Sequence, residues 1–177
     1  VILTPTYYLK QHTSKLKDVN NSEKKVQTMK LDDNDNIYLC LDGSPGLYKV
    51  DAGADRENTP ATRITDSENY IQQGSDILIH TDGSIYITCS QTRKVFRYHD
   101  NTFTHIAGDG SEDTDNNTNP LEASFLNPRG ICITTYNDLL ICDDNNTADP
   151  KGSLRALGGY KPALSTTVVS TGETSYV

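Results

Sequence analysis

The sequence predicts an all-β fold made of small antiparallel sheets, and three observations lead to this prediction. Ten Tyr residues, with frequent Thr, Ile and Val and many Asn, Asp, Gly and Ser, favour strands joined by tight turns. No apolar pattern with the period of a helix extends beyond two helical turns. A strand-turn-strand pattern occurs three times along the chain.

The three copies of this pattern have similar lengths and similar turns. They are MKLDDNDNIYLCLD (residues 29–42), ILIHTDGSIYITCS (residues 77–90) and ICITTYNDLLICDD (residues 131–144). In each copy, Asp, Asn or Gly residues separate two apolar strands. Aligned on Ile37, Ile85 and Leu139, the copies are 48 and 54 residues apart, which is close to the length of a four-stranded antiparallel sheet.

The residues that follow each copy complete a sheet. The continuations are GLYKVDAG (residues 46–53) in the first copy, KVFRYHD and TFTHIAG (residues 94–100 and 102–108) in the second, and GSLRALGG (residues 152–159) in the third. Sheets this small must stack on one another to bury both faces. We therefore expect repeats at residues 24–70, 71–120 and 121–177, with residues 1–23 as a lead-in or as the outer strand of a preceding repeat.

Charge and hydropathy exclude two classes of partner. The 177 residues carry a formal net charge of -8, and the 16 Lys and Arg are scattered along the chain. We expect no nucleic-acid binding, because the scattered basic residues indicate no positively charged face that could bind phosphate groups. No apolar run of about 18 residues occurs, so we expect no direct membrane insertion. The chain begins with Val1 and shows no intact signal peptide, which indicates a mature product or an excerpt of a longer polypeptide.

One long stretch resembles a known family. The sequence HIAGDGSEDTDNNTNPLEASFLNPRGICI (residues 105–133) is similar to the linker between blades in NHL-repeat β-propellers. The resemblance implies that Phe125 acts as an apolar plug between neighbouring blades. It also implies that Pro128 fixes φ just before the next inner strand begins to pair, and that Gly130 permits a sharp entry into this crowded strand. Residues 143–146 resemble the family's Asp-x-x-Asn turn, whose short side chains cap backbone groups.

The resemblance covers residues 24–177, which makes three repeats. The third repeat matches best, while the second has Cys89-Ser90-Gln91 in place of an acidic turn and the first lacks the Pro-x-Gly element. The family closes its ring with about six blades. The resemblance therefore implies a β-propeller segment of four-stranded antiparallel blades that belongs to a larger ring. A short ring assembled from several chains is the alternative.

The function implied by this fold is non-enzymatic. We expect a protein-binding or structural assembly module, with protein partners or self-assembly, and the long linker at residues 108–127 as the contact surface. The signatures of a nucleophile elbow, a zinc protease helix and a phosphate-binding loop are absent from the sequence. The alternative is a propeller hydrolase or lyase with a metal at the central channel, which would need Asp76, His80 and Asn137 to converge.

No cofactor is expected, and calcium is the one ion that the sequence leaves open. Residues 32–36 (DDNDN) and residues 109–117 (DGSEDTDNN) are rich in the oxygen ligands that calcium prefers. Neither stretch has the central Gly and terminal Glu of an EF-hand loop. Asp and Asn are also the residues that turns require, so turn chemistry is the simpler explanation of both stretches.

Three glycosylation sequons indicate an extracellular or cell-surface protein. Asn20, Asn116 and Asn145 each begin an N-x-[ST] triplet in a segment that we interpret as a loop or terminus.

The four Cys residues leave a disulfide between Cys132 and Cys142 open. A two-residue turn at Asp82-Gly83 would set Ile79 opposite Tyr86. The aligned third hairpin would then point the two thiols to opposite faces, so the bond requires a turn with an odd number of residues.

Overall fold

The computed structural model describes residues 22–54, 60–144, 152–158 and 167–169 of the 177-residue chain. These residues form three four-stranded antiparallel sheets, so the all-β prediction is confirmed. Sheet 1 contains β1 (Val26–Leu31), β2 (Ile37–Leu41), β3 (Ser44–Val50) and β4 (Thr62–Arg63). Sheet 2 contains β5 (Gly74–Ile79), β6 (Ile85–Cys89), β7 (Lys94–His99) and β8 (Thr102–Ala107). Sheet 3 contains β9 (Pro128–Ile133), β10 (Leu139–Asp143), β11 (Ser153–Gly158) and β12 (Thr167–Val169).

Two short 3-10 turns, η1 (Ser67–Asn69) and η2 (Pro120–Glu122), lie in the connections between the sheets. In the described part of the chain, no helix is long and apolar enough to cross a membrane. The expected lead-in at residues 1–23 falls almost wholly outside the described residues.

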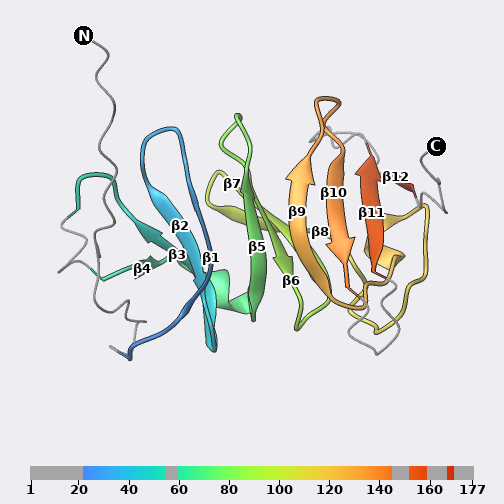
Figure 1. The fold of residues 1–177 in the computed structure, drawn as a ribbon, viewed down its shortest axis with the longest axis horizontal. Helices are drawn as coiled ribbons and strands as arrows, with labels where there is room; N and C mark the ends of the chain where they lie inside the picture. The colour runs from blue at the N-terminus through green and yellow to red at the C-terminus, as the bar shows by residue number, and fades with distance from the viewer. Residues whose placement is uncertain (1–21, 55–59, 145–151, 159–166, 170–177) are drawn as a thin grey trace, which may run out of the picture.

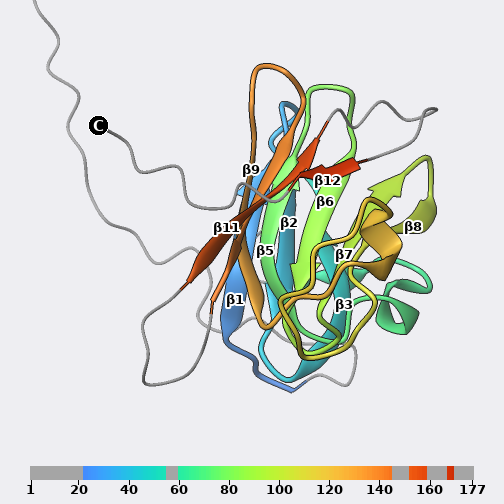
Figure 2. The ribbon, with the colours of Figure 1, turned by 90° about the vertical axis from the view of Figure 1, so that its right-hand side faces the viewer.

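The three sheets stand in a row with their first strands side by side. β5 contacts β1 on one side and β9 on the other (Figure 1). Figure 2 views the row from its end, with sheet 3 nearest the viewer. Because each sheet presents a face to its neighbour, sheet 2 is covered on both faces.

The strand β6 shows why these residues form a stacked sheet. Ile85 and Ile87 point into the cluster shared with sheet 1, whereas Tyr86 between them points into the cluster shared with sheet 3. All residues of β6 are buried. A strand that is buried on both faces needs a nearly continuous apolar run, and IYITC provides it. The buried hydroxyl of Thr88 donates to the Arg129 carbonyl.

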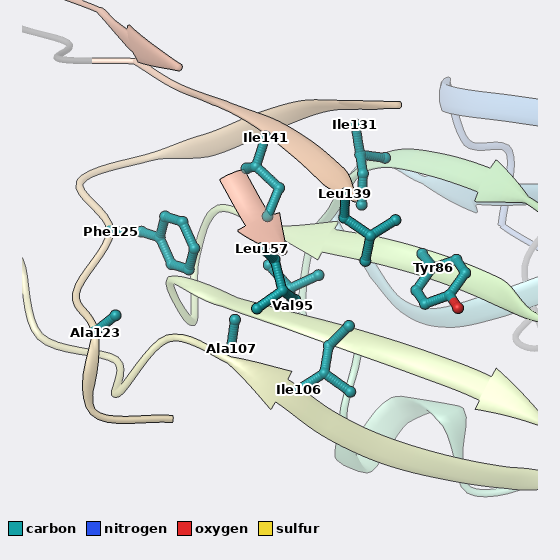
Figure 3. Packing of buried hydrophobic residues seen from close by; sticks show 10 residues of the cluster. All are labelled: Tyr86, Val95, Ile106, Ala107, Ala123, Phe125, Ile131, Leu139, Ile141 and Leu157. Carbon is teal, nitrogen blue, oxygen red and sulfur yellow. The ribbon is translucent and has the colours of Figure 1, made fainter. Parts of the chain in front are cut away.

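The core between sheets 2 and 3 is drawn in Figure 3. Side chains from β6, β7 and β8 meet side chains from β9, β10 and β11. Phe125, which belongs to the linker, is 1% exposed and completes this cluster with Ala123. The apolar plug that the sequence implied at Phe125 is thus where it was expected.

The core between sheets 1 and 2 is built in the same way. Its buried members are Cys40, Leu47, Ile71, Ile77, Ile85, Ile87, Cys89 and Phe96. Sheet 1 also carries a cluster of its own, formed by Leu39, Leu41, Tyr48, Val50 and Ala61.

Two details of the sequence prediction were wrong. Ile79 pairs with Ile85 and not with Tyr86, because five residues separate the paired ends of β5 and β6. Gly130 is not required by crowding, since a Cβ added there would meet its nearest atom, Cys142 Sγ, at an ordinary 3.7 Å. Pro128 does begin β9, as the sequence implied.

Candidate functional site

The loops between the first two strands of each sheet share one backbone geometry, and we call residues 32–36, 80–84 and 134–138 the hairpin tips. In each tip, the first N–H donates to the fifth carbonyl, over 3.0 Å from Asp32 to Asn36, 2.8 Å from His80 to Ser84 and 2.9 Å from Thr134 to Asp138. The fourth residue has a positive φ, 61° at Asp35, 82° at Gly83 and 65° at Asn137. Asp, Gly and Asn tolerate this conformation. All three tips therefore project from the same end of the row of sheets (Figure 1).

The first residue of a tip also holds the turn with its side chain. Asp32 Oδ1 accepts hydrogen bonds of 2.9 Å from the backbone N–H groups of Asn34 and Asn36. Asp32 Oδ2 accepts a further bond of 2.8 Å from the Asn36 amide. Burial by itself would raise the pKa of Asp32, but these hydrogen bonds outweigh it and lower that pKa. The Asp32 side chain therefore stays charged at neutral pH.

The second tip carries a compact charged network. His80 Nδ1 lies 2.8 Å from Asp82 Oδ1, and Arg97 Nη2 lies 3.9 Å from Asp82 Oδ2. The Arg97 guanidinium also donates to Ser84 Oγ over 2.8 Å. Partial burial would raise the pKa of Asp82, but hydrogen bonds from Ser84 and His80 prevail and lower that pKa to about 2. Asp82 is thus held within its own tip by hydrogen bonds and lies near the Arg97 guanidinium of its own sheet.

A hollow of about 270 Å³ lies between the first and second tips. Its polar lining comes from Asp32, Asp33, Asn34, Tyr38, His80 and Thr81. Leu31, Ile79 and Ile85 supply apolar surface to the same hollow. Asp33 is exposed, and no ion pair joins it to another described residue. The hollow therefore combines an apolar wall with uncompensated negative charge, an arrangement that suits a long basic side chain.

Asp76 lies on β5 and joins the first strands of all three sheets. Its Oδ1 accepts a hydrogen bond of 3.0 Å from Thr28 Oγ1 on β1, and its Oδ2 accepts one of 3.2 Å from the Ile131 N–H on β9. Lys30 Nζ lies 4.0 Å from Oδ1. The carboxylate is committed to these structural contacts, which is a sufficient reason for an acidic residue at this position.

The structure does not bring the three residues of the alternative metal site together. Asp76 and His80 are four residues apart along an extended chain, which separates them by about 13 Å. His80 pairs with Asp82 in its own tip, and Asn137 belongs to the tip of another sheet. Within the described residues, no group of three or more His, Cys, Asp or Glu could hold a metal ion.

The two acidic stretches are organised by internal hydrogen bonds. In residues 32–36, the Asp32 carboxylate is occupied as described above. In residues 109–117, the Asp109 carboxylate accepts from the Ser111 hydroxyl over 2.7 Å and from the Ser124 hydroxyl over 3.2 Å. Hydrogen bonds from Ser111, with burial opposing them, lower the pKa of Asp109. Both stretches thus have the turn chemistry that the sequence offered as the explanation besides calcium.

The long linker at residues 108–127 lies at the opposite end from the tips and is tied to sheet 3. Arg155 donates from Nη1 to the Ser124 carbonyl over 2.9 Å and from Nη2 to the Asp115 carbonyl over 3.1 Å. Asp143 accepts from the backbone N–H groups of Leu126 and Asn127, over 3.2 and 2.7 Å. The two charged side chains also pair with each other at 3.4 Å, and they are 5% and 0% exposed.

This pair explains the acidic residue that ends β10. Burial is the main reason why the pKa of Asp143 is raised and that of Arg155 is lowered, although each charge opposes the shift of the other. Asp143 caps backbone groups, as the sequence implied for residues 143–146, but it caps those of the linker. Residues 145 and 146 lie outside the described part of the chain.

Only one of the three sequons lies in the described residues. Asn116 is exposed in the linker, where a glycan would have room. Asn20 and Asn145 lie outside the described residues.

The register of the third hairpin does not set Cys132 directly opposite Cys142, the pair for which the sequence left a disulfide open. The five-residue tip does put both thiols on one face, but it pairs Cys132 with Leu140, and Cys142 Sγ lies near the Gly130 position. All four Cys residues are free thiols in this structure, of which Cys132 and Cys142 are exposed and Cys40 and Cys89 are buried.

Sequence reasoning missed the hollow and the role of Asp76. The hollow is made by side chains 48 residues apart, so no local pattern could reveal it. Asp76 did leave a signal, because a carboxylate inside an otherwise apolar strand requires a partner. The sequence prediction gave Asp76 a role only as a ligand of the alternative metal site.

Comparison with known proteins identifies the fold of the chain and does not identify its function. No protein-family model matches the sequence, and no curated protein matches it. A solved structure of a protein of unknown function from Bacteroides thetaiotaomicron VPI-5482 is similar, with a TM-score of 0.58 and 16% identity over 76% of this chain and 33% of that one. An auxiliary nutrient binding protein from the same organism has a TM-score of 0.58 and 19% identity over 84% of this chain and 36% of that one.

A third similar structure is that of a nidogen/laminin complex. It has a TM-score of 0.56 and 14% identity over 82% of this chain and 48% of the other. The chain thus spans between a third and a half of the length of the structures it matches. The described sheets have the fold of a β-propeller segment.

Proposed function

We propose that this chain belongs to an NHL-like β-propeller that acts as a non-enzymatic, extracellular or cell-surface protein-binding module. Its partner docks on the hairpin tips and places a Lys or Arg side chain in the hollow between the first two tips. Within a ring of about six blades, the three repeats of this chain make up one part of the docking face.

The observation that carries the proposal is the composition of the hollow. Leu31, Ile79 and Ile85 can cover the aliphatic part of a basic side chain, while Asp33 lies beside its charged end. Asp82 is not among the residues that line the hollow, and its carboxylate is engaged within its own tip by Ser84 and His80. Asp32 adds a second negative charge to the wall of the hollow.

Rigidity supports a docking role for the tips. Each tip is closed by hydrogen bonds of its own, so a partner meets a preformed surface and little ordering entropy is lost on binding. The net charge of -8 favours basic partners over nucleic acid. The similar structure of a nidogen/laminin complex is consistent with a propeller that binds another protein.

The proposal is tested by site-specific photo-crosslinking. A benzoylphenylalanine at Thr81, on the rim of the hollow, is compared with one at Thr114, an exposed linker residue at the opposite end. The full chain is incubated with the secreted proteins of its source and irradiated. We expect one discrete cross-linked partner from Thr81 and none from Thr114. A partner captured only from Thr114 would move the binding face to the linker, and no product from either position would contradict the binding role.

The extracellular part of the proposal has a separate test at Asn116. Intact mass of the protein from its native source should fall after glycosidase treatment, and Asn116→Gln should remove one glycan. An unchanged mass would contradict an extracellular location without affecting the test of the tips.

A further inference from the structure

The glycine at the start of β5 leaves a space that a thiol from the neighbouring sheet fills. A Cβ added at Gly74 would lie 2.3 Å from Cys40 Sγ and 3.0 Å from Cys40 Cβ. Real side-chain atoms never come this close, so only glycine is compatible with the present position of Cys40. The thiol of sheet 1 therefore occupies the volume that a side chain at Gly74 would take in sheet 2.

A second buried thiol lies directly across the ladder from the same glycine. Gly74 on β5 pairs with Cys89 on β6. Residues that pair directly in an antiparallel ladder point to the same face, with Cβ positions about 4.5–5.5 Å apart. Cys40 Sγ is thus next to the position that faces Cys89. Both Cys residues belong to one apolar cluster, at 1% and 0% exposure.

The two thiols also influence each other electrostatically. Burial is the main reason why the pKa of Cys89 is raised, and the neighbouring Cys40 raises it further. Burial likewise raises the pKa of Cys40 to about 12. The two thiols thus share one apolar cluster, and both border the empty Cβ position of Gly74.

We propose that Cys40 and Cys89 form a disulfide bond that links sheet 1 to sheet 2 when the chain folds in an oxidising compartment, with a small-molecule disulfide such as oxidised glutathione as the oxidant. The proposal goes beyond the proposed function: it rests on the extracellular location proposed there and not on the binding role of the tips. Cys132 and Cys142, which are exposed, remain free thiols.

The exchange is balanced in atoms and electrons. One protein thiol loses its proton, and its thiolate attacks a sulfur of the oxidant, whose S–S bond breaks to release one thiolate. The second protein thiolate attacks the protein-bound sulfur of this mixed disulfide and displaces the remaining thiolate. Two protein thiols are oxidised to one disulfide, and the oxidant is reduced to two thiols that take up the two protons.

Burial determines when the bond can form. Thiolate is the reacting species, and it is scarce at neutral pH when the two residues are enclosed in the core. The exchange therefore belongs to folding or to a local opening of the two sheets. The folded, reduced protein should react slowly with added oxidant or alkylating reagent at these two positions.

Peptide mapping tests the proposal on the full chain. The protein is refolded with reduced and oxidised glutathione, blocked with iodoacetamide and digested with trypsin without reduction. Cys40 falls in the peptide of residues 31–49, Cys89 in that of residues 64–93, and both other Cys residues in that of residues 130–151. We expect the first two peptides to be linked, with a mass lower than their sum by two hydrogens, and the third to carry two alkylated Cys.

Two controls make the result decisive. The double variant Cys132→Ser and Cys142→Ser should give the same link at the same yield, because those thiols take no part. Oxidation by glutathione in concentrated guanidinium chloride should abolish the preference for this pair, because the chain is unfolded and the sheets are not formed. The proposal is overturned if all four Cys are alkylated after native refolding, if the third peptide is closed internally, or if the link forms equally well in denaturant.

Discussion

The Asp76 carboxylate accepts a hydrogen bond from the backbone N–H of Ile131 at 3.2 Å, across 55 residues of sequence. The same carboxylate accepts from Thr28 on the other side, across 48 residues. One side chain of β5 therefore fixes the first strands of both neighbouring sheets. The spacing of the hairpin tips follows from this contact, because β1, β5 and β9 each lead directly into a tip.

Replacing Asp76 with Ala should destabilise the fold strongly. The change leaves the Ile131 N–H and the Thr28 hydroxyl without their acceptor in a partly buried place. We expect the free energy of unfolding to fall by about 2–3 kcal/mol. Urea unfolding followed by circular dichroism measures this loss.

Thr28→Val is the matched control for that change. It removes one hydrogen bond at the same carboxylate, conserves volume and leaves the bond from Ile131 in place. A loss of only about 1 kcal/mol is expected. Equal losses in the two variants would show that Asp76 does not join three sheets.

Arg155→Met should loosen the linker as well as destabilise sheet 3. It leaves the buried Asp143 charge without its partner and removes the guanidinium donors from the carbonyls of Asp115 and Ser124. We expect a loss of about 3–5 kcal/mol in the free energy of unfolding. Hydrogen exchange at Ser124, whose N–H donates to the Asp115 carbonyl, should become faster. Unchanged exchange there would show that Arg155 does not hold the linker.

The sequence was sufficient for the architecture because the repeat is encoded locally. Alternating apolar residues and an Asp, Asn or Gly turn recur in each copy, and each copy forms one sheet. The length of the turn was not deducible from Asp82-Gly83 alone. The positive φ at Gly83 belongs to the fourth residue of a five-residue tip, and a two-residue turn would use the same glycine.

Gly74→Ala should be costly, and the cost should depend on Cys40. The added Cβ would lie 2.3 Å from Cys40 Sγ, so one of the two sheets must shift. We expect a loss of about 1–3 kcal/mol in the free energy of unfolding.

Adding Cys40→Ala to that variant removes the atom that clashes. The double variant should lose less unfolding free energy than the sum of the losses in the two single variants, because the two residues are in contact. Additive losses in a thermal or urea unfolding series would rule out the close approach of Cys40 to β5.

Asp82 should make the free energy of unfolding depend on pH in the acidic range. Its pKa is lowered to about 2 in the folded protein, from an ordinary 3.8. The unfolded chain therefore binds a proton first as the pH falls, and the stabilisation, complete above about pH 4, is lost toward pH 2. Asp82→Asn lacks this group, so the difference in unfolding free energy between the two proteins should shrink over that range. A constant difference would contradict the role of Asp82 in its tip.

The candidate site was less accessible from the sequence than the fold. Asp33 and Thr81 belong to turns that the sequence identified, but their meeting depends on how sheets 1 and 2 stack. The acidic stretch at residues 32–36 drew attention as a calcium candidate, whereas the structure uses Asp32 to hold the turn and leaves Asp33 for the hollow. Likewise, the pairing of Cys40 with Cys89 runs through Gly74, a residue that no cysteine spacing would suggest.

The central claim is that the hollow between the first two tips binds a basic side chain. The most direct test is titration of a fluorescent lysine-rich peptide with three proteins: the unchanged chain, Asp33→Lys and Asp113→Lys. Both variants change the net charge equally, and both residues are exposed, but Asp113 lies in the linker at the opposite end. We predict that Asp33→Lys weakens binding about tenfold and that Asp113→Lys leaves it nearly unchanged. Equal weakening by the two variants would mean that the peptide senses only the overall charge, and the hollow would not be the binding site.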